Sequence, residues 1–349
     1  MHPQRTLYSA HRLTPPACEV CSQEHGISRC EHCQSVYYCG WDHRYQGIHA
    51  EKCEHILSER KRLESMLAKH KKNRENGHVE VEDPLQGILG PYPDSRDVAK
   101  SYMVLVFSIL DVFGQRGGRR EAVQRAAELL ESVQALDIRD VVRCRQFLTA
   151  CYIRLGRDDE AYDFIRSFDY SKNSHAGRIV LPCLDLTAPN VLQTRVPARQ
   201  NPSRVDDHFV KLVMLMKIRV FFELQEIQKV RKVTRQLFLP ELDYVVQGWC
   251  MSPTLFRYRS INSLWTDEEV RDLKLRIKDD VKQLFKTLHT ANPDFWLQLL
   301  IDVGAIPPEQ GRTPGGDVRL QGNCFPEWAE TPGAVDIVMT LGGFDRPRE

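Results

Sequence analysis

The stretch "CEVCSQEHGISRCEHCQSVYYCGWDHRYQGIHAEKC", residues 18–53, decides the fold of the N-terminal part of this chain. Six of the eleven cysteines of the 349-residue sequence lie within it, together with closely spaced histidines. A disulfide framework would not concentrate its cysteines in so short a part of a large chain, whereas a metal site requires such a concentration. The stretch therefore predicts bound metal.

Eight side chains of this stretch follow one another at the spacings of metal ligands, as two CxxC pairs, a CxxxH pair and an HxxxC pair. A two-residue spacer lets two thiolates of one turn reach one ion, and a three-residue spacer places both ligands on one face of a helix. Zinc takes four such ligands, so eight ligands predict two zinc ions with no open position, which is typical of a structural site. The eight are Cys18, Cys21, Cys30, Cys33, Cys39, His43, His49 and Cys53.

Two other interpretations of the cysteines explain less. A set of free buried cysteines does not account for two CxxC pairs within sixteen residues. A redox role of a CxxC pair is expected beside a βαβ pattern, which the sequence lacks. His32 lies inside the second CxxC turn and is expected at the surface.

The order of these ligands, with "YYC" at 37–39, resembles the MYND-type zinc finger over residues 18–53. The resemblance implies a cross-braced fold in which alternate pairs of ligands share an ion. One zinc ion would take Cys18, Cys21, Cys39 and His43, and the other would take Cys30, Cys33, His49 and Cys53. The remainder of the chain is loosely similar to uncharacterised fungal-type MYND-finger proteins, which carry a stretch like "RLGRDDEAYDF" (154–164) in a helical region.

Two ligand positions depart from the family pattern. The family usually has cysteine where this chain has His43, which is also an acceptable zinc ligand. This chain has fewer residues between His43 and His49 than the family has, so the last helix must enter the finger differently.

MYND-type fingers are protein-interaction modules that bind short proline-containing peptides, usually through a glutamine and a tryptophan. Arg44 and Gln46 stand at those two places here. Trp41 and Tyr45 could supply an aromatic wall instead. In the other interpretation, Trp41 and Tyr38 pack the small core of the finger.

After residue 50, apolar residues recur at helical spacing and predict a mainly helical chain without a run of strands. Gly156 is a plausible helix end, and Thr266 with Glu269 forms a capping box. The first half of the longest helix, which begins at 209, is apolar almost all round and is expected to be buried. The predicted helices cover residues 50–75, 102–113, 123–133, 141–155, 161–168, 209–238 and 266–289.

The predicted fold class is a small zinc-stabilised cross-brace finger followed by a mainly α domain. Similar stretches at 117–123 and 155–162 indicate either tetratricopeptide-like hairpins or two plain consecutive hairpins, and both alternatives stay open. The predicted organisation comprises a flexible lead-in at 1–17, the finger at 18–53, a charged helix and linker at 54–97, a helical domain at 98–302 and a Gly/Pro-rich tail region at 303–349, of which 303–334 reads as loop.

The composition excludes several classes of protein. A net charge of +1 gives no general attraction to nucleic acid or to an anionic membrane. No apolar run reaches the roughly 20 residues that span a bilayer, and the N-terminus has no apolar core of signal-peptide type. The chain is therefore expected in the reducing interior of the cell, in the nucleus or the cytoplasm.

The sequence contains no motif that is typical of an enzyme. It lacks a phosphate-binding loop, a dinucleotide fingerprint and the cofactor motif of SET-domain methyltransferases. Cys183, His175 and Asp185 have the residue types of a nucleophilic triad but no pattern that brings them together. Cys144 and Cys151 are best interpreted as core residues.

These observations predict a non-enzymatic, zinc-binding protein–protein interaction adaptor or regulatory protein whose partner is a protein, in the family mode a short peptide segment. The alternative is a nucleic-acid-associated regulator that uses the basic segment 59–75. Lys and Glu interleave in that segment, as they do on a solvated helix.

Overall fold

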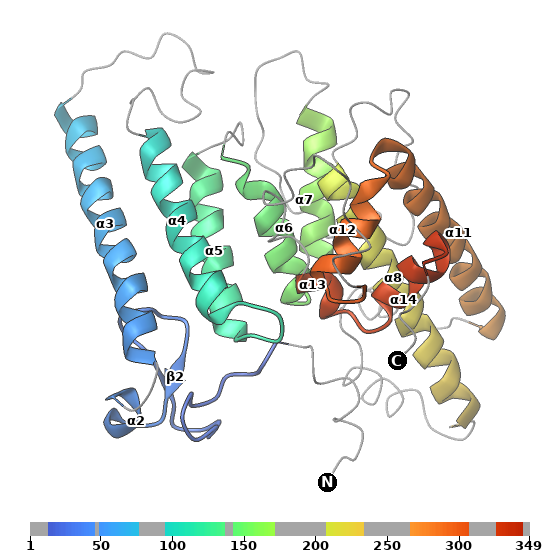
Figure 1. Ribbon diagram of the computed structural model, residues 1–349, viewed down its shortest axis with the longest axis horizontal. Coiled ribbons are helices and arrows are strands. Elements are labelled where there is room, and N and C mark those ends of the chain that lie inside the picture. The colour runs from blue at the N-terminus through green and yellow to red at the C-terminus, as the bar shows by residue number, and fades with distance from the viewer. Residues whose placement is uncertain are drawn as a thin grey trace. The chain divides into compact units, whose positions relative to one another are not determined.

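The computed structural model describes residues 13–45, 49–76, 95–136, 142–171, 207–233, 266–306 and 326–344. Within these ranges the chain is mostly helical, as predicted, and has one two-stranded sheet (Figure 1). The described residues form two compact units, unit 1 up to Leu155 and unit 2 from Gly156. This division lies inside the region 98–302, and the organisation inferred from composition stays a prediction.

Unit 1 begins with the finger. Strands β1 (Ser28–Arg29) and β2 (Tyr37–Tyr38) pair antiparallel, with Ser28 opposite Tyr38. Tight turns precede and connect the strands: the Ser22 amide donates to the carbonyl of Cys18, and the Gln34 amide donates to that of Cys30. The short helix α2 (Trp41–Tyr45) and the long helix α3 (His49–Asn76) follow. The predicted ligands lie on these turns, directly after β2, in α2 and in the first turns of α3.

Three helices complete unit 1. Helix α4 (Ser95–Phe113) packs along α3, α5 (Arg120–Leu136) packs on α4, and α6 (Cys144–Arg154) packs on α5. Figure 1 shows α3, α4 and α5 side by side. A Cβ atom at Gly118 would lie 2.5 Å from the carbonyl oxygen of Phe113, so the turn between α4 and α5 requires glycine. Cys144 and Cys151 are buried core residues, as predicted.

Unit 2 consists of helices alone within its described residues, and they are α7 (Asp158–Ser171), α8 (Asp207–Val233), α11 (Asp267–Ala291), α12 (Asp294–Asp302), α13 (Pro326–Ala329) and α14 (Ala334–Gly342). Helix α8 is buried almost all round in its first half and packs on α11, which confirms its predicted burial. Gly156 precedes α7 with φ 74°, as expected for a glycine that ends the preceding helix. The predicted capping box of Thr266 and Glu269 is present.

The tail differs from its predicted loop-like character. Pro326 opens α13, and Gly333 and Gly343 flank α14 with positive φ angles, so the prolines and glycines bound helices here instead of excluding them. Trp328 is fully buried, and its ring meets that of Trp296 edge-on at a centroid distance of 5.7 Å. The tail thus contributes to the core of unit 2.

Several predictions are not tested, because their residues lie outside the described ranges or are divided between the two units. Cys183, His175 and Asp185 lie outside the described residues, as do most of the lead-in and of the linker. The second predicted hairpin is divided between the units, with α6 in unit 1 and α7 in unit 2, so a tetratricopeptide-like repeat stays a prediction. None of the described helices combines the length and apolarity that a membrane span needs.

Candidate metal centres

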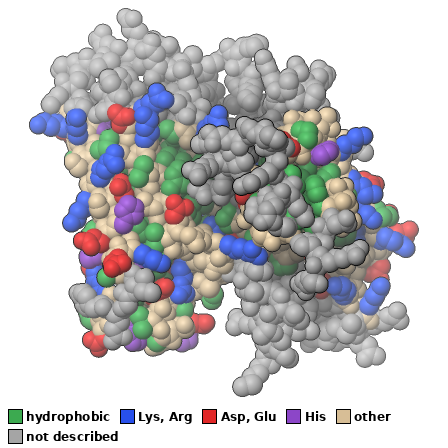
Figure 2. All heavy atoms as spheres, viewed as in Figure 1, with side chains coloured by type: hydrophobic (Ala, Val, Ile, Leu, Met, Phe, Trp, Pro, Cys, Tyr) green, Lys and Arg blue, Asp and Glu red, His purple; other side chains and the backbone are tan. Residues whose placement is uncertain are grey.

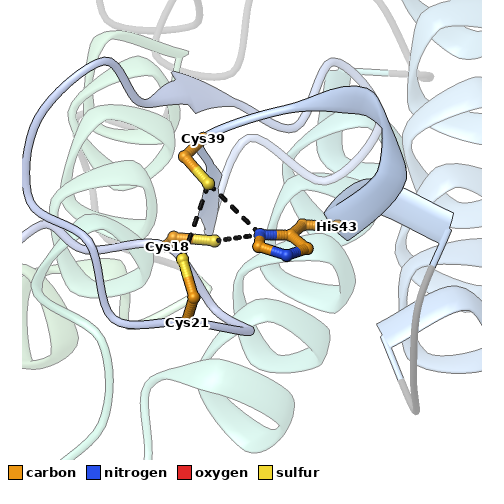
Figure 3. Close-up of side chains that lie close together, drawn as sticks. All are labelled: Cys18, Cys21, Cys39 and His43. Carbon is orange, nitrogen blue, oxygen red and sulfur yellow. Dashed lines mark hydrogen bonds between the residues drawn. The ribbon is translucent and has the colours of Figure 1, made fainter.

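Four side chains from three parts of the finger meet in the cluster that we call site 1. Cys18 and Cys21 lie on the turn before β1, Cys39 follows β2, and His43 lies in α2. Figure 3 shows the four side chains pointing toward one another. The sulfurs of Cys21 and Cys39 are 3.5 Å apart, and Nδ1 of His43 lies 3.2 Å from Cys39 and 3.5 Å from Cys18.

A second cluster, site 2, joins the turn between the strands to the start of α3. Cys30 and Cys33 come from the turn, and His49 and Cys53 occupy one face of α3. The sulfurs of Cys30 and Cys53 are 3.6 Å apart, and Nε2 of His49 lies 4.0 Å from the sulfur of Cys33. The structure thus brings together the two sets of four that the family resemblance implies.

The spacing of the donor atoms fits a tetrahedral cation. Within each site, the four ligand atoms all lie within 4.8 Å of one another. A tetrahedron with Zn–S bonds of about 2.3 Å and Zn–N bonds of about 2.0 Å has edges of about 3.8 Å between sulfurs and about 3.5 Å between nitrogen and sulfur. Disulfide sulfurs would be only about 2.05 Å apart, and the six cysteines are free. Each Cys3His cluster could therefore bind a metal ion.

The electrostatics of site 1 also favour a cation. Burial opposes ionisation of Cys18, but hydrogen bonds from nearby backbone amides and from His43 lower its pKa to about 6. The hydrogen bond with Cys21, together with burial, raises the pKa of Cys39 to about 11. One thiolate thus forms readily and the next one resists ionisation, because like charges in one site repel each other. A divalent cation would relieve that repulsion.

In site 2, which is more buried, the pKa of one cysteine is again lowered while the pKa of another is raised. The pKa of Cys30 is lowered by hydrogen bonds from Cys33 and Cys53, whereas the pKa of Cys33 is raised by its hydrogen bonds with Cys30 and Cys53 and by burial. Burial lowers the pKa of His49, but contacts with Cys30 and Cys53 outweigh it and raise this pKa to about 9.

Residues outside the predicted ligand set hold site 2 in place. The ring of Tyr38 meets the His49 ring edge-on at 5.2 Å, and Phe113 of α4 stacks on it at 5.5 Å. Arg60 donates from Nη1 to the backbone carbonyls of Glu31 (2.8 Å) and His32 (3.1 Å) in the second CxxC turn. Sequence reasoning missed both Phe113 and Arg60. A signal existed for Arg60, which lies seven residues after Cys53, two turns along the same face of α3.

The aromatic side chains in and near α2 could form a wall for a partner or pack the core of the finger, and their exposure distinguishes these two interpretations. Trp41 is 67% exposed and therefore does not pack the core of the finger, whereas Tyr38 is buried. The guanidinium of Arg44 lies 5.1 Å from the centre of the Trp41 ring and 3.4 Å from the carboxylate of Glu31. The side chains of Tyr45 and Gln46 lie outside the described residues. His32 is exposed and belongs to neither site.

The basic segment 59–75 forms part of α3, where acidic side chains pair with several of its basic ones. Arg60 pairs with Glu64 at 2.9 Å and Arg62 with Glu59 at 3.7 Å. Figure 2 shows basic and acidic side chains interspersed on the α3 side of unit 1. This arrangement is typical of a solvated helix face.

Neither a protein-family model, nor a curated protein, nor a solved structure matches this chain. The interpretation of the two sites therefore rests on their own residues.

Proposed function

We propose that residues 18–53 bind two zinc ions in a cross-braced finger of MYND type and that the chain acts as a protein–protein interaction adaptor. The interleaved arrangement carries the zinc proposal: each site takes its ligands from parts of the finger that are separate in the sequence, and each gathers three sulfurs and one imidazole nitrogen. Tetrahedral sulfur and nitrogen donors are typical of zinc.

The zinc ions would serve the fold. Four protein ligands complete a zinc tetrahedron, so neither site keeps a position for water or substrate. A segment as short as the finger buries too little apolar surface to fold alone, and metal binding would supply the missing free energy. We therefore propose a structural, non-catalytic finger.

The exposed Trp41 supports the adaptor role. Tryptophan is among the side chains that most often dominate the binding energy of protein interfaces, and α2 exposes Trp41 over the largely covered guanidinium of Arg44. The partner would be a protein segment that covers the Trp41 ring. The nucleic-acid alternative gains no comparable observation, because basic residues of 59–75 pair with acidic residues of the same helix.

Native mass spectrometry of the full chain tests the zinc proposal. We expect two zinc ions per chain, one zinc ion after His43→Ala, and two after the control substitution His32→Ala. One zinc ion or none in the unsubstituted chain would contradict the proposal. Two zinc ions in the His43→Ala chain would show that another side chain completes site 1.

Proximity labelling with the full chain tests the adaptor role. We expect Trp41→Ala to lose labelled proteins that Leu275→Ala retains, because Leu275 is also an exposed large apolar residue, at 55%, but lies in unit 2. Identical labelling by both variants would argue against docking at Trp41. Recovery of nucleic acid that depends on residues 59–75 would favour the alternative.

A further inference from the structure

The two sites differ in their exposure to solvent. In site 1, Cys18 is buried, Cys21 is exposed, and Cys39 and His43 are half-buried. In site 2, all four side chains are between 3% and 7% exposed. A small molecule in solution can therefore reach a sulfur of site 1 directly but not one of site 2.

The cover of site 2 comes from both the finger and the helices. The Tyr38 ring meets the His49 ring edge-on and the Phe113 ring stacks on it. Helix α3, which carries two of the ligands, packs along α4. Opening site 2 would require separating these packed elements. Within the described part of the chain, site 1 has no comparable cover over Cys21, so the exposed thiolate is the first to meet an oxidant.

We propose that site 1 is an oxidant-sensitive zinc site, in which peroxide joins Cys21 to Cys39 as a disulfide while site 2 retains its zinc. This proposal rests on the proposed binding of two zinc ions. The two sulfurs are 3.5 Å apart and must close to about 2.05 Å. Sulfurs in site 2 are similarly close, with 3.6 Å between Cys30 and Cys53, so exposure and not distance distinguishes the sites.

The chemistry balances with hydrogen peroxide as the oxidant. The Cys21 thiolate attacks one peroxide oxygen, the O–O bond breaks, and a sulfenic acid forms on Cys21 while one water leaves. The Cys39 thiolate then attacks the Cys21 sulfur, the S–O bond breaks, and the oxygen leaves as a second water. Two electrons pass from the two thiolates to the peroxide, and two protons come from solvent. Site 1 then keeps only Cys18 and His43, too few ligands to retain zinc.

Oxidation would also act on the proposed docking surface. His43 lies in α2, two residues from Trp41, and contacts Cys18 of the first CxxC turn, while Cys39, which precedes α2, contacts Cys21 of that turn. In the zinc-bound finger, His43 and Cys39 would therefore tie this short helix to the turn. Loss of zinc from site 1 releases His43 and loosens the helix that carries Trp41. Partner binding through Trp41 would therefore weaken in the oxidised chain and return after reduction with zinc present.

Treatment of the full chain, first shown to hold two zinc ions, with hydrogen peroxide tests the proposal. A chromogenic zinc chelator measures the released metal, and peptide mapping after thiol alkylation locates the disulfide. We expect one zinc ion released per chain, a Cys21–Cys39 disulfide, and zinc uptake again after dithiothreitol and zinc are added. Release of both ions together, or a disulfide among Cys30, Cys33 and Cys53, would overturn the proposal.

Two matched variants sharpen the test. Cys21→His keeps four ligands in site 1 but cannot form the disulfide, so we expect peroxide to release no zinc from it. His32→Ala is the control, because His32 is exposed and belongs to neither site, and we expect it to lose one zinc ion as the unsubstituted chain does. If Cys21→His fails to fill site 1 at the start, the disulfide map of the unsubstituted chain decides. Fewer than two zinc ions before oxidation would contradict the proposed function itself.

Discussion

The finger and unit 2 are each stabilised by a different kind of interaction. In the finger, eight ligand side chains converge on two points around a small core. In unit 2, the buried helix α8 places charged side chains in the core: Arg219 pairs with Asp158 at 2.9 Å, both about 1% exposed, and Lys217 pairs with Asp280 at 2.7 Å. Under the proposed function the finger depends on an external ion, whereas the charges in the core of unit 2 are supplied by its own chain.

This difference has an energetic consequence. Metal binding to a finger adds directly to its folding free energy. A buried ion pair adds little net stability, because the two charges lose their hydration, but removing one partner is costly since the other charge stays buried. Arg219 also donates from Nε to the hydroxyl of Thr331 at 3.0 Å, so its position is fixed from two sides. We therefore expect zinc to control the finger and single charges to control unit 2.

Removal of zinc should give the largest effect. Structural zinc contributes about 10–16 kcal/mol in finger peptides, so a chelator should unfold the finger and leave unit 2 folded. Hydrogen exchange measures both: amides of residues 28–38 should lose protection, and amides in the middle of α11 should keep it. Equal loss of protection in both regions would mean that the finger and unit 2 are not independently held.

The substitution Asp158→Ala should give the next largest effect. It leaves the guanidinium of Arg219 buried without its carboxylate, which costs about 3–5 kcal/mol, measured as a lower urea midpoint of unit 2. The control is Asp279→Ala, which removes a carboxylate whose side chain is 78% exposed and whose pairing with Lys282 is correspondingly weak. Similar midpoints for the two variants would show that the buried pair does not stabilise unit 2.

A smaller effect should follow from Arg60→Met, which removes the hydrogen bonds from α3 to the second CxxC turn. Loss of a residue that supports metal ligands typically lowers metal affinity about 10-fold or more, and we expect such a loss at site 2 alone. Competition with chelators of graded strength measures it. Arg62→Met is the control, because the side chain of Arg62 is 62% exposed and pairs with Glu59. Equal zinc affinities would exclude Arg60 from the support of site 2.

The smallest effect should come from Thr266→Ala at the start of α11. The Thr266 hydroxyl accepts from the Glu269 amide at 3.2 Å, and the Glu269 carboxylate accepts from the Thr266 amide. Loss of such a cap costs about 1 kcal/mol, visible as a small decrease in the unfolding free energy of unit 2 with unchanged zinc content. A decrease as large as that of Asp158→Ala would contradict the order of effects proposed here.

The sequence predicted the features that depend on residues close to one another along the chain. Ligand spacing is local, and so are the helical pattern and the capping box, which the structure contains. It did not predict the pairing of Asp158 with Arg219, because these residues are far apart in the sequence and nothing in either neighbourhood identifies the other. The contact of Phe113 with His49 was missed for the same reason.

In the tail, the high glycine and proline content led to a loop prediction for residues that form α13 and the start of α14. Pro326 and Gly333 contributed to the loop predicted at 303–334, but Pro326 opens α13 and Gly333 precedes α14. Trp328 could have corrected this interpretation, because a large apolar side chain in a polar, glycine-rich segment needs a core to cover it. Its complete burial shows that one aromatic residue can outweigh the average composition around it.

X-ray absorption spectroscopy at the zinc edge, combined with metal analysis of the full chain, tests the central claim most directly. The account predicts two zinc ions per chain with an average shell of three sulfurs at about 2.3 Å and one nitrogen at about 2.0 Å. One zinc ion or none, or a shell in which oxygen replaces sulfur or nitrogen, would contradict the two closed Cys3His sites.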